Sequence, residues 1–328
     1  MLLLALLPCT LIIGLMTGPA FISLADIWAI YTGSGVSQEQ LIIEVIRLPR
    51  VILSALVGAL LATCGALLQG LFRNPLADPA LIGVSAGASV GASSMIVFGS
   101  LLAANGVLLG LPAISLGAFV GALITSVIIF RLATGPRGTS VATMLLAGIA
   151  ISALAGAATN LLSYLADNDM LRRISLWQMG NLDGATWDRV TVCATIALLL
   201  AVLIPRESRA LNAMLLGESE ARHLGVNVEW LKRRLIIYSA LGVATSVAVA
   251  GVIAFVGLMI PHLVRLLVGP DHRSLIPLSA LAGAILLVAA DALARVVVAP
   301  AELPVGVVTA ILGAPFFLWL LIVQRGRD

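Results

Sequence analysis

Long apolar runs separated by short polar stretches dominate the pattern of this sequence. A helix needs about 20 apolar residues to cross a hydrocarbon core about 30 Å thick. Runs of roughly this kind occupy residues 2–18, 51–71, 81–102, 111–132, 141–165, 190–204, 235–252, 253–268, 276–298 and 305–323. The pattern predicts about ten transmembrane helices, and we interpret residues 1–328 as a single all-α transmembrane domain.

Two of these runs need separate comment. The seventh and eighth join into one apolar stretch, residues 235–268, which is too long for a single crossing, so we place a turn at Ala250–Gly251. The first run lacks the basic segment of a signal peptide and is followed by many more runs. We therefore interpret it as the first transmembrane helix.

The composition excludes an ordinary water-soluble domain. Hydrophobic residues make up 60% of the chain and charged residues 11%, whereas a soluble domain usually carries about 25% charged residues. We expect a multi-pass membrane protein surrounded by lipid. The sequence contains no basic patch with interleaved aromatic residues, so a nucleic-acid partner is not expected. The three cysteines are isolated within apolar runs and are interpreted as packing residues rather than disulfides or metal ligands.

Basic residues predict the orientation. An even number of spans places both termini on one side, and lysine and arginine favour the cytoplasmic side. If the termini are cytoplasmic, 6 of the 19 basic residues lie outside and 19 − 6 = 13 lie inside. The six are Arg47, Arg50, Arg172, Arg173, Arg189 and Arg295. We therefore expect cytoplasmic termini, with the polar segment 205–234 between spans six and seven on the cytoplasmic side.

Three shorter patterns predict local structure. Gly83, Gly87 and Gly91 recur every four residues, which favours close packing of the third span against a neighbouring helix. The loop FRNPLADP, residues 72–79, is expected to stop one helix and start the next. The outer loop 166–189 carries two tryptophans and is expected to hold a short interfacial helix.

The sequence lacks the residues of an energy-converting enzyme. Its only lysine, Lys232, follows no glycine-rich turn, so a phosphate-binding loop is absent. No nucleophile elbow and no recognisable metal-binding motif is present. An ion-coupled transporter would place carboxylates within its spans, and Asp291 is the one candidate. Because Arg295 lies four residues later, a local ion pair is the preferred interpretation of Asp291.

Four segments together resemble a known family. They are RLPRVILSALVGALLATCGALLQGLFRNPLADPALIGVSAGA (47–88), LLGESEARHLGV (215–226), FVGLMIPHLVRLLVGPDHR (255–273) and AELPVGVVTAILGAPFFLWLL (301–321). They resemble the ten-span FecCD-type permeases of bacterial ABC importers for iron-siderophores, haem and cobalamin. The resemblance implies a type II ABC importer permease in the bacterial inner membrane. It further implies a homodimer of this chain, two copies of a cytoplasmic ATPase that uses ATP and Mg, and a periplasmic substrate-binding protein.

The resemblance also implies site residues. The segment LLGESEARHLGV resembles coupling helices that seat in a cleft of the ATPase, and the residues expected there are Leu216, Gly217, Glu218, Ala221, Arg222, Leu224 and Gly225. Small residues would allow close approach, and Glu218 and Arg222 are spaced for an i,i+4 pair. The basic run 232–234 is then interpreted as the cytoplasmic anchor of span seven.

Two further sets follow from the resemblance. Arg47, Arg50 and Arg295 match arginines that receive acidic residues of the binding protein, a role that suits the planar guanidinium group. Their outer position breaks the positive-inside trend, which is an independent reason to expect a partner for them. Asn74, Leu76, Thr139 and Ser140 resemble the cytoplasmic gate of the family.

The cargo is the least determined feature. Across the segments that carry the resemblance, the sequence resembles haem permeases most, and permeases for ferric siderophores or cobalamin are the alternatives. The chain is expected to hold no cofactor or metal of its own, and haem enters as substrate. If haem passes, the side chains available at the outer entrance are Met170, Arg172, Arg173 and Met179. A secondary transporter and a structural membrane protein remain as alternatives of other classes.

Overall fold

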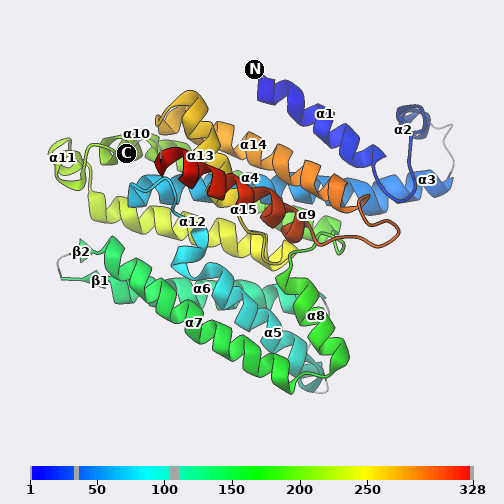
Figure 1. Cartoon of the computed structure of the whole chain (residues 1–328), viewed down its shortest axis with the longest axis horizontal. Coiled ribbons are helices and arrows are strands. Elements are labelled where there is room, and N and C mark those ends of the chain that lie inside the picture. Colours follow the sequence, from blue (N-terminus) through cyan, green and yellow to red (C-terminus); the bar gives the residue numbers. More distant parts are fainter. Residues whose placement is uncertain (1, 33–36, 104–110, 137, 326–328) are drawn as a thin grey trace.

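A computed structural model describes residues 2–32, 37–103, 111–136 and 138–325 of the chain (Figure 1). Its α-helices are α1 (Leu2–Met16), α2 (Leu24–Tyr31), α3 (Ser37–Leu41), α4 (Leu48–Phe72), α5 (Val84–Ala103), α6 (Leu111–Ala133), α7 (Val141–Leu165), α8 (Asn168–Gln178), α9 (Trp187–Leu203), α10 (Ser208–Met214), α11 (Glu218–His223), α12 (Val228–Ala250), α13 (Val256–Val268), α14 (His272–Ala294) and α15 (Val305–Arg325). A π-helical segment (Ile42–Arg47) and two 3₁₀ segments (Pro79–Ile82 and Ile204–Glu207) extend these helices, and β1 (Thr134–Gly135) pairs with β2 (Gly138–Thr139).

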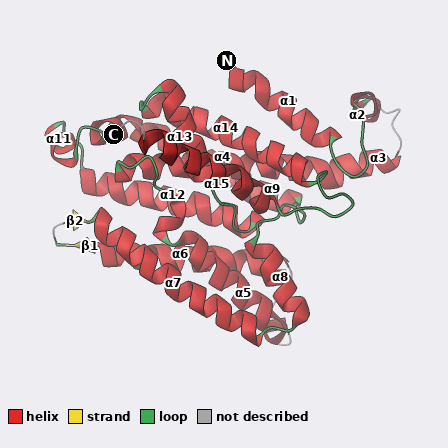
Figure 2. Cartoon of the chain, viewed as in Figure 1, coloured by secondary structure: helices red, strands yellow, loops and turns green. Residues whose placement is uncertain are grey.

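Each of the ten predicted apolar runs contains one long helix. Among the described residues, six helical stretches are long and apolar enough to cross a membrane, and four apolar helices are shorter. The all-α prediction is confirmed, apart from the two-residue strands of the β1–β2 hairpin. Helices occupy nearly all of the chain, and the strands lie at one end (Figure 2).

The second span begins earlier than its apolar run predicts. The run starts at residue 51, but the helical stretch extends from Gln38 to Phe72. Arg47 and Arg50 interrupt the apolar pattern, yet both side chains are buried inside the bundle. A hydropathy criterion ends the span at these charges because it treats every arginine as solvent-facing.

The central helix is α4, which packs against α9, α12, α13 and α14. Two of its glycines allow the closest approaches. A Cβ at Gly58 would lie 2.2 Å from the Gly283 carbonyl oxygen of α14, and one at Gly65 would lie 1.7 Å from the Gly257 carbonyl oxygen of α13. No larger residue fits these positions without moving a backbone. Small residues therefore set the helix spacing around the centre of the bundle.

The predicted glycine face of the third span packs against α6. Gly87 and Gly91 oppose Gly121 and Gly117, and a Cβ at Gly91 would lie 1.9 Å from the Gly117 carbonyl oxygen. The helix-packing interpretation of this face is confirmed. Gly83 precedes α5 and has φ of 72°, a conformation that favours glycine.

The turn between the seventh and eighth spans lies where the sequence predicts it. Helix α12 ends at Ala250, and Gly251 follows with φ of 70°. The Asn181 backbone N–H donates to the Ala250 carbonyl oxygen (2.7 Å), so the loop after α8 covers this helix end. The expected interfacial helix in the outer loop is α8, which confirms that a short helix lies there.

The two ends of the bundle carry different elements. The β1–β2 hairpin, α10 and α11 gather at the end that we call the hairpin end, whereas α2, α3 and α8 lie toward the opposite end (Figure 1). Helix α1 leads away from the hairpin end and α15 returns toward it (Figure 1). Arg137 and Arg327, two of the charges assigned to the cytoplasmic side, lie outside the described residues.

Candidate functional site

The segment with the expected coupling residues forms a short helix between two glycine turns. Gly217 precedes α11 with φ of 131°, and Gly225 follows it with φ of 84°. Both values lie in a region that side-chain-bearing residues rarely adopt. The sequence predicts these glycines as close-approach positions, and the structure adds a conformational reason for glycine at both. A Cβ at Gly217 would also meet the Glu220 carboxylate at 2.1 Å, whereas Gly225 has open space.

The expected contact residues of this segment divide into exposed and buried ones. Leu216 and Leu224 are 67% and 64% exposed, and Arg222 also lies on the surface. Ala221 is fully buried against its own chain. The expectation that Ala221 contacts a partner does not fit this packing, because its methyl group already fills a space below α11. Glu218 and Arg222 form the expected i,i+4 pair at 3.7 Å.

The side chain of Lys232 lies among the charged side chains of the hairpin end. It is 3% exposed, and its Nζ donates to Glu218 Oε2 (2.8 Å), to the Thr139 carbonyl oxygen (2.9 Å) and to Glu229 Oε1 (3.5 Å). These contacts occupy all three donors of the ammonium group. The interpretation of Lys232 as a membrane anchor is therefore wrong, because its charge is buried among protein acceptors.

The β1–β2 hairpin is held against α12 by a second set of contacts. Glu229 Oε2 accepts a hydrogen bond from the Thr139 backbone N–H (2.8 Å). Gly138 has φ of 100°, and a Cβ there would lie 2.6 Å from Glu229 Oε1. The Thr134 and Thr139 hydroxyls lie 3.1 Å apart across the hairpin. We call the group Glu218, Arg222, Glu229, Lys232 and Thr139 the lysine cluster.

The expected gate residues lie beside the lysine cluster. Thr139 and Ser140 line a cavity of about 500 Å³ together with Arg73, Glu218 and Lys232. Ser140 also caps α7, its hydroxyl accepting from the Thr143 backbone N–H (3.3 Å). The structure therefore brings two expected gate residues next to an expected coupling residue.

The other two expected gate residues lie in the loop that follows α4. Asn74 Oδ1 accepts from the Leu76 backbone N–H (2.9 Å), which shapes the turn, and Leu76 is 36% exposed. The preceding Arg73 caps α4 in a left-handed conformation with φ of 49°. The loop thus stops one helix and starts the next, as its sequence predicts. A gating role for these residues stays a prediction.

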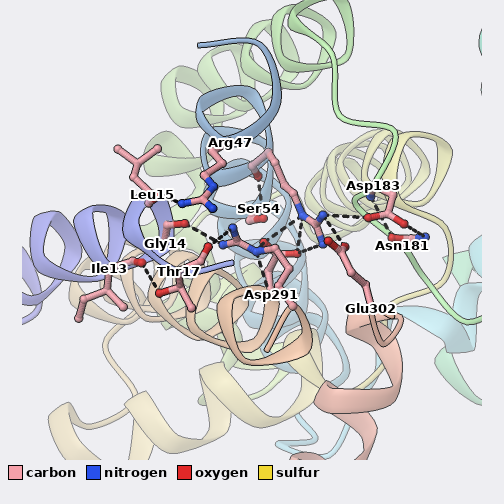
Figure 3. Close-up of polar contacts among 12 residues, drawn as sticks. Ile13, Gly14, Leu15, Thr17, Arg47, Ser54, Asn181, Asp183, Asp291 and Glu302 are labelled. Carbon is pink, nitrogen blue, oxygen red and sulfur yellow. Dashed lines mark hydrogen bonds and ion pairs between the residues drawn. The ribbon is translucent and has the colours of Figure 1, made fainter. Parts of the chain in front are cut away.

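A buried network of arginines lies toward the opposite end of the molecule. Arg50 pairs with Asp291 (2.9 Å), Asp183 (2.8 Å) and Glu302 (2.7 Å) (Figure 3). Arg295 pairs with the same Asp291 at 3.2 Å. The local pair expected between Asp291 and Arg295 is confirmed, and Arg50 joins it from α4. We call Arg47, Arg50, Asp183, Asp291, Arg295 and Glu302 the arginine network.

Two of these arginines bind the end of α1. Arg295 donates to the carbonyl oxygens of Thr17 (2.6 Å) and Gly14 (2.8 Å) (Figure 3). Arg47 donates to those of Leu15 (2.7 Å), Met16 (3.0 Å) and Ala20. The last carbonyl groups of a helix lack partners within it and attract cations. The two guanidinium groups supply those partners and fix α1 to the bundle.

These contacts change the expectation for Arg47, Arg50 and Arg295. All three are at most 5% exposed, so the docking charges expected on the outer surface lie inside the chain. Their break with the positive-inside trend does signal a partner, but the partners seen here are intramolecular. Contact with a binding protein stays untested. Asp183 and Glu302 are the residues of the network that the sequence pattern does not single out; both lie in loops between spans.

The two loop carboxylates of this network differ in pKa. Burial is the largest influence on each and acts to raise the pKa. For Glu302 the pKa is raised, because burial and the hydrogen bond with Asp183 outweigh the attraction of Arg50. For Asp183 the pKa is lowered, because hydrogen bonds with Glu302, Asn181 and Arg50 outweigh burial.

The four expected entrance residues do not share one cavity. Arg173 lines a cavity of about 250 Å³ with Asp183 and Arg189. Met179 lines a different, apolar cavity of about 600 Å³ between the end of α8 and α15. Met170 is half-buried against the core, and Arg172 is exposed on α8. Within the part of the chain that the structure describes, no group of three His, Cys, Asp or Glu side chains is arranged to hold a metal ion.

Known proteins resemble the chain over most of its length. Residues 4–323 match the FecCD transport family. The chain is 50% identical over 280 residues to the hemin transport system permease protein HmuU of Yersinia pestis, covering 85% of this chain and 83% of that protein. It is 45% identical over 283 residues to the cobalamin import system permease protein BtuC of Halobacterium salinarum, covering 86% and 73%. It is 42% identical over 325 residues to the vitamin B12 import system permease protein BtuC of Klebsiella pneumoniae subsp. pneumoniae, covering 98% and 92%.

Solved structures share the fold. One, described as an inward-facing conformation of a metal-chelate type ABC transporter, matches with a TM-score of 0.87 and 34% identity over 98% of this chain and 97% of that one. A chain of PsaBC from Streptococcus pneumoniae in complex with Fab matches with a TM-score of 0.59 and 18% identity over 90% and 93%, which shows the fold alone. The near-complete family match and these identities show that the chain belongs to the FecCD transport family, as the permease subunit of a type II ABC importer whose ATPase is a separate subunit.

Proposed function

We propose that this chain carries haem across the inner membrane as the permease of an ATP-driven importer. The observation that carries this proposal is the 50% identity to a hemin permease over 280 residues, compared with 45% and 42% to two cobalamin or vitamin B12 permeases. Cobalamin is the second candidate because those identities are also high and one of them spans 98% of the chain. A ferric siderophore is the third.

In the proposed complex, two copies of this chain pair and two ATPase subunits bind at the hairpin end. The hairpin end would then be cytoplasmic, together with both termini. Leu216 and Leu224 support this assignment, because they flank α11 as exposed apolar side chains beside charged ones. Exposed apolar anchors within a charged rim are typical of protein interfaces. Asn74, Leu76, Thr139 and Ser140 would close the path when the motor is idle.

An ion-coupled mechanism has little support from the only carboxylate expected within a span. Asp291 is 1% exposed and pairs with both Arg50 and Arg295. A coupling carboxylate lines the path of the transported ion, whereas Asp291 is enclosed by two guanidinium groups of its own chain. We therefore assign Asp291 to the architecture of the bundle.

Reconstitution tests the cargo. The chain, its neighbouring ATPase and the cognate binding protein are placed in liposomes, and ATP-dependent entry of haem, a ferric siderophore and cobalamin is measured. We expect haem to enter fastest. Faster entry of cobalamin would overturn the haem assignment while leaving the importer intact, and entry that needs an ion gradient but no ATP would overturn both.

Two variants test the finer assignments. Leu216→Asp should weaken ATPase binding about tenfold, since charged substitution of an exposed apolar anchor removes its contact. Ser219→Asp, at an exposed position of α11 outside the seven expected contact residues, is the control and should leave ATPase binding unchanged. For the entrance, replacing Arg172 and Arg173 by glutamine should lower haem entry more than cobalamin entry if they receive propionate groups. Equal entry of haem before and after that double change would remove the arginines from the path.

A further inference from the structure

We propose that Lys232 is a positioning residue that links the ATPase-binding helix to the gate hairpin. The proposal rests on the proposed function of α11 and of residues 139–140. Lys232 Nζ donates at the same time to Glu218 on α11 (2.8 Å) and to the Thr139 carbonyl oxygen on β2 (2.9 Å). One buried ammonium group therefore touches both the segment that meets the motor and the segment that borders the path.

The route through this ammonium group is short because of how α12 is placed. Lys232 lies one turn into α12, and Glu229 from the preceding turn holds the backbone N–H of Thr139 (2.8 Å). Both backbone groups of Thr139 are therefore hydrogen-bonded to α12: its N–H donates to Glu229, and its carbonyl oxygen accepts from Lys232. The hairpin follows the two side chains rather than moving independently of α12.

The contact of Lys232 with α11 is more accessible to water than its contact with Thr139. Glu218 reaches Lys232 from outside the bundle, and its side chain is 31% exposed. Arg222 lies 3.7 Å from Glu218 and 3.8 Å from Glu229, and its side chain is 56% exposed. A displacement of α11 by the ATPase would pull on Glu218 and so change the acceptors available to Lys232. The ammonium group would then redistribute its hydrogen bonds between α11 and Thr139.

Charge balance explains why a lysine suits this position. Glu218 and Glu229 supply two negative charges, and Lys232 and Arg222 supply two positive ones. The three donors of an ammonium group rotate freely, so it can exchange acceptors without the fixed geometry of a guanidinium group. Arginine at 232 would retain the charge but hold a planar arrangement of donors.

The test measures transport and ATP hydrolysis in the same reconstituted complex. Glu218→Gln removes the attachment to α11 and leaves the Thr139 contacts in place. Because Glu218 is itself an expected ATPase contact, the ratio is measured only in assembled complexes with the ATPase bound, where we expect the number of substrate molecules carried per ATP to fall about tenfold, within the usual range of coupling between sites. Glu220→Gln is the matched control, because it makes the same charge change on the exposed side of α11 and should leave the ratio unchanged.

A second variant guards against simple damage to the fold. Lys232→Arg keeps a cation that can donate both to Glu218 and to the Thr139 carbonyl oxygen, and we expect it to retain part of the ratio that Lys232→Gln loses. Equal ratios for Glu218→Gln and Glu220→Gln, with ATPase still bound and active, would overturn the link and leave the proposed function standing. Failure of the ATPase to bind the unchanged protein would instead overturn the proposed function.

An independent observation concerns an apolar groove of about 690 Å³ between α9 and α14, floored by α4. We infer that it holds the acyl chain of an anionic phospholipid. On α9 and the start of the 3₁₀ segment after it, the lining extends from Ala194 to Ile204, a rise of about 15 Å, which is about half of a 30 Å hydrocarbon core. The groove therefore has the depth of one leaflet, on the side of the hairpin end.

The mouth of this groove carries positive charge. Arg273 lines it, and among the described residues no ion pair involves its guanidinium group. The neighbouring Asp271 carboxylate attracts this charge without forming an ion pair with it, and its own hydrogen bonds come from Asn212 Nδ2 (2.6 Å) and the Arg273 backbone N–H (2.9 Å). An anionic headgroup above an apolar chain matches this arrangement, since basic residues at the membrane surface attract anionic lipids.

Native mass spectrometry of the protein in nanodiscs tests this site. With phosphatidylglycerol against phosphatidylcholine as the two probes, we expect one retained lipid and about a fivefold preference for the anionic one, as about 1 kcal/mol per arginine would give. Arg273→Gln should remove the preference, and Arg131→Gln, an exposed arginine at the end of α6, should keep it. Ala197→Phe should reduce retention of both lipids by filling the groove. An unchanged preference in Arg273→Gln, or unchanged retention in Ala197→Phe, would overturn the site.

Discussion

The lysine cluster and the arginine network use the same kinds of charge in opposite ways. In the network, Asp291 and Arg50 join α14 to α4, with side chains 1% and 7% exposed. In the lysine cluster, Lys232 is the one charged side chain buried to that degree, and its partners Glu218 and Glu229 are 31% and 39% exposed. The Arg50–Asp291–Arg295 core of the network is closed to water, although its loop carboxylates Asp183 and Glu302 are 52% and 25% exposed, whereas the lysine cluster has no fully buried carboxylate.

This difference has a physical consequence. A charge pair away from water resists separation because each partner left alone would lie in a poor solvent. A pair with one partner in water separates at little cost because water replaces the lost contact. The network is therefore suited to hold long helices in place, and the cluster is suited to let a short helix move. The predictions below test this contrast from the largest expected effect to the smallest.

The largest effect should follow loss of the shared carboxylate. Asp291→Asn leaves Arg50 and Arg295 without their common partner inside the bundle, and we expect the free energy of unfolding to fall by about 3–5 kcal/mol. Denaturant titration in detergent measures this loss. Glu218→Gln, the matched removal of one charge in the lysine cluster, should cost at most about 1 kcal/mol. Similar losses at the two positions would contradict the contrast.

An intermediate effect is expected at the glycines that flank α11. Gly225→Ala places a side chain at φ of 84° in open space. Backbone strain alone should then raise the free energy of the α11 conformation by about 1–2 kcal/mol. Gly217→Ala adds a clash with the Glu220 carboxylate and should cost more. ATPase affinity in each variant is the measurement, since the cost falls on the shape of α11. Gly135→Ala, which also meets nothing within 4 Å and has no positive φ, is the control and should bind normally.

The smallest effect concerns the two loop carboxylates of the network. The lowered pKa of Asp183 means that it stabilises the fold above its unfolded pKa and loses this contribution as the pH falls through the folded value. The raised pKa of Glu302 means the reverse: its contribution is present in acid and is lost as the pH rises through the folded value.

Substitution by amides separates these two groups. At neutral pH, Asp183→Asn should cost about 0.5–1 kcal/mol, because half of its side chain is in water, and Glu302→Gln should cost less. The cost of Asp183→Asn should shrink as the pH is lowered toward 4, as measured by denaturant titrations across pH. A larger cost for Glu302→Gln at neutral pH would reverse the assigned directions.

Several features of the fold follow from the sequence because they depend on local pattern. Each predicted apolar run contains one long helix, and the turn at Ala250–Gly251 lies where the double-length run requires it. The glycine spacing of the third span predicts a packing face, and α6 occupies it. Span boundaries near Arg47 and Arg50 do not follow, because hydropathy cannot distinguish a buried charge from an exposed one.

The candidate sites divide in the same way. The motif LLGESEARHLGV identifies the segment around α11, and its spacing predicts the pair Glu218–Arg222. It does not reveal that Ala221 points into the chain or that Lys232 reaches across to Thr139, 93 residues away. The partners of Arg50 lie 133 to 252 residues away in sequence, so no local pattern connects them.

The sequence alone determined that this chain is a membrane protein of about ten helices, that it lacks a phosphate-binding loop, and which motifs mark its family. These properties depend on composition and on spacing within one segment. Tertiary structure alone decided which charges are buried and with whom, because the free energy of a buried charge depends on the partners that other helices bring to it. For that reason Arg50 and Lys232 are read as surface charges in the sequence and lie among internal partners in the fold.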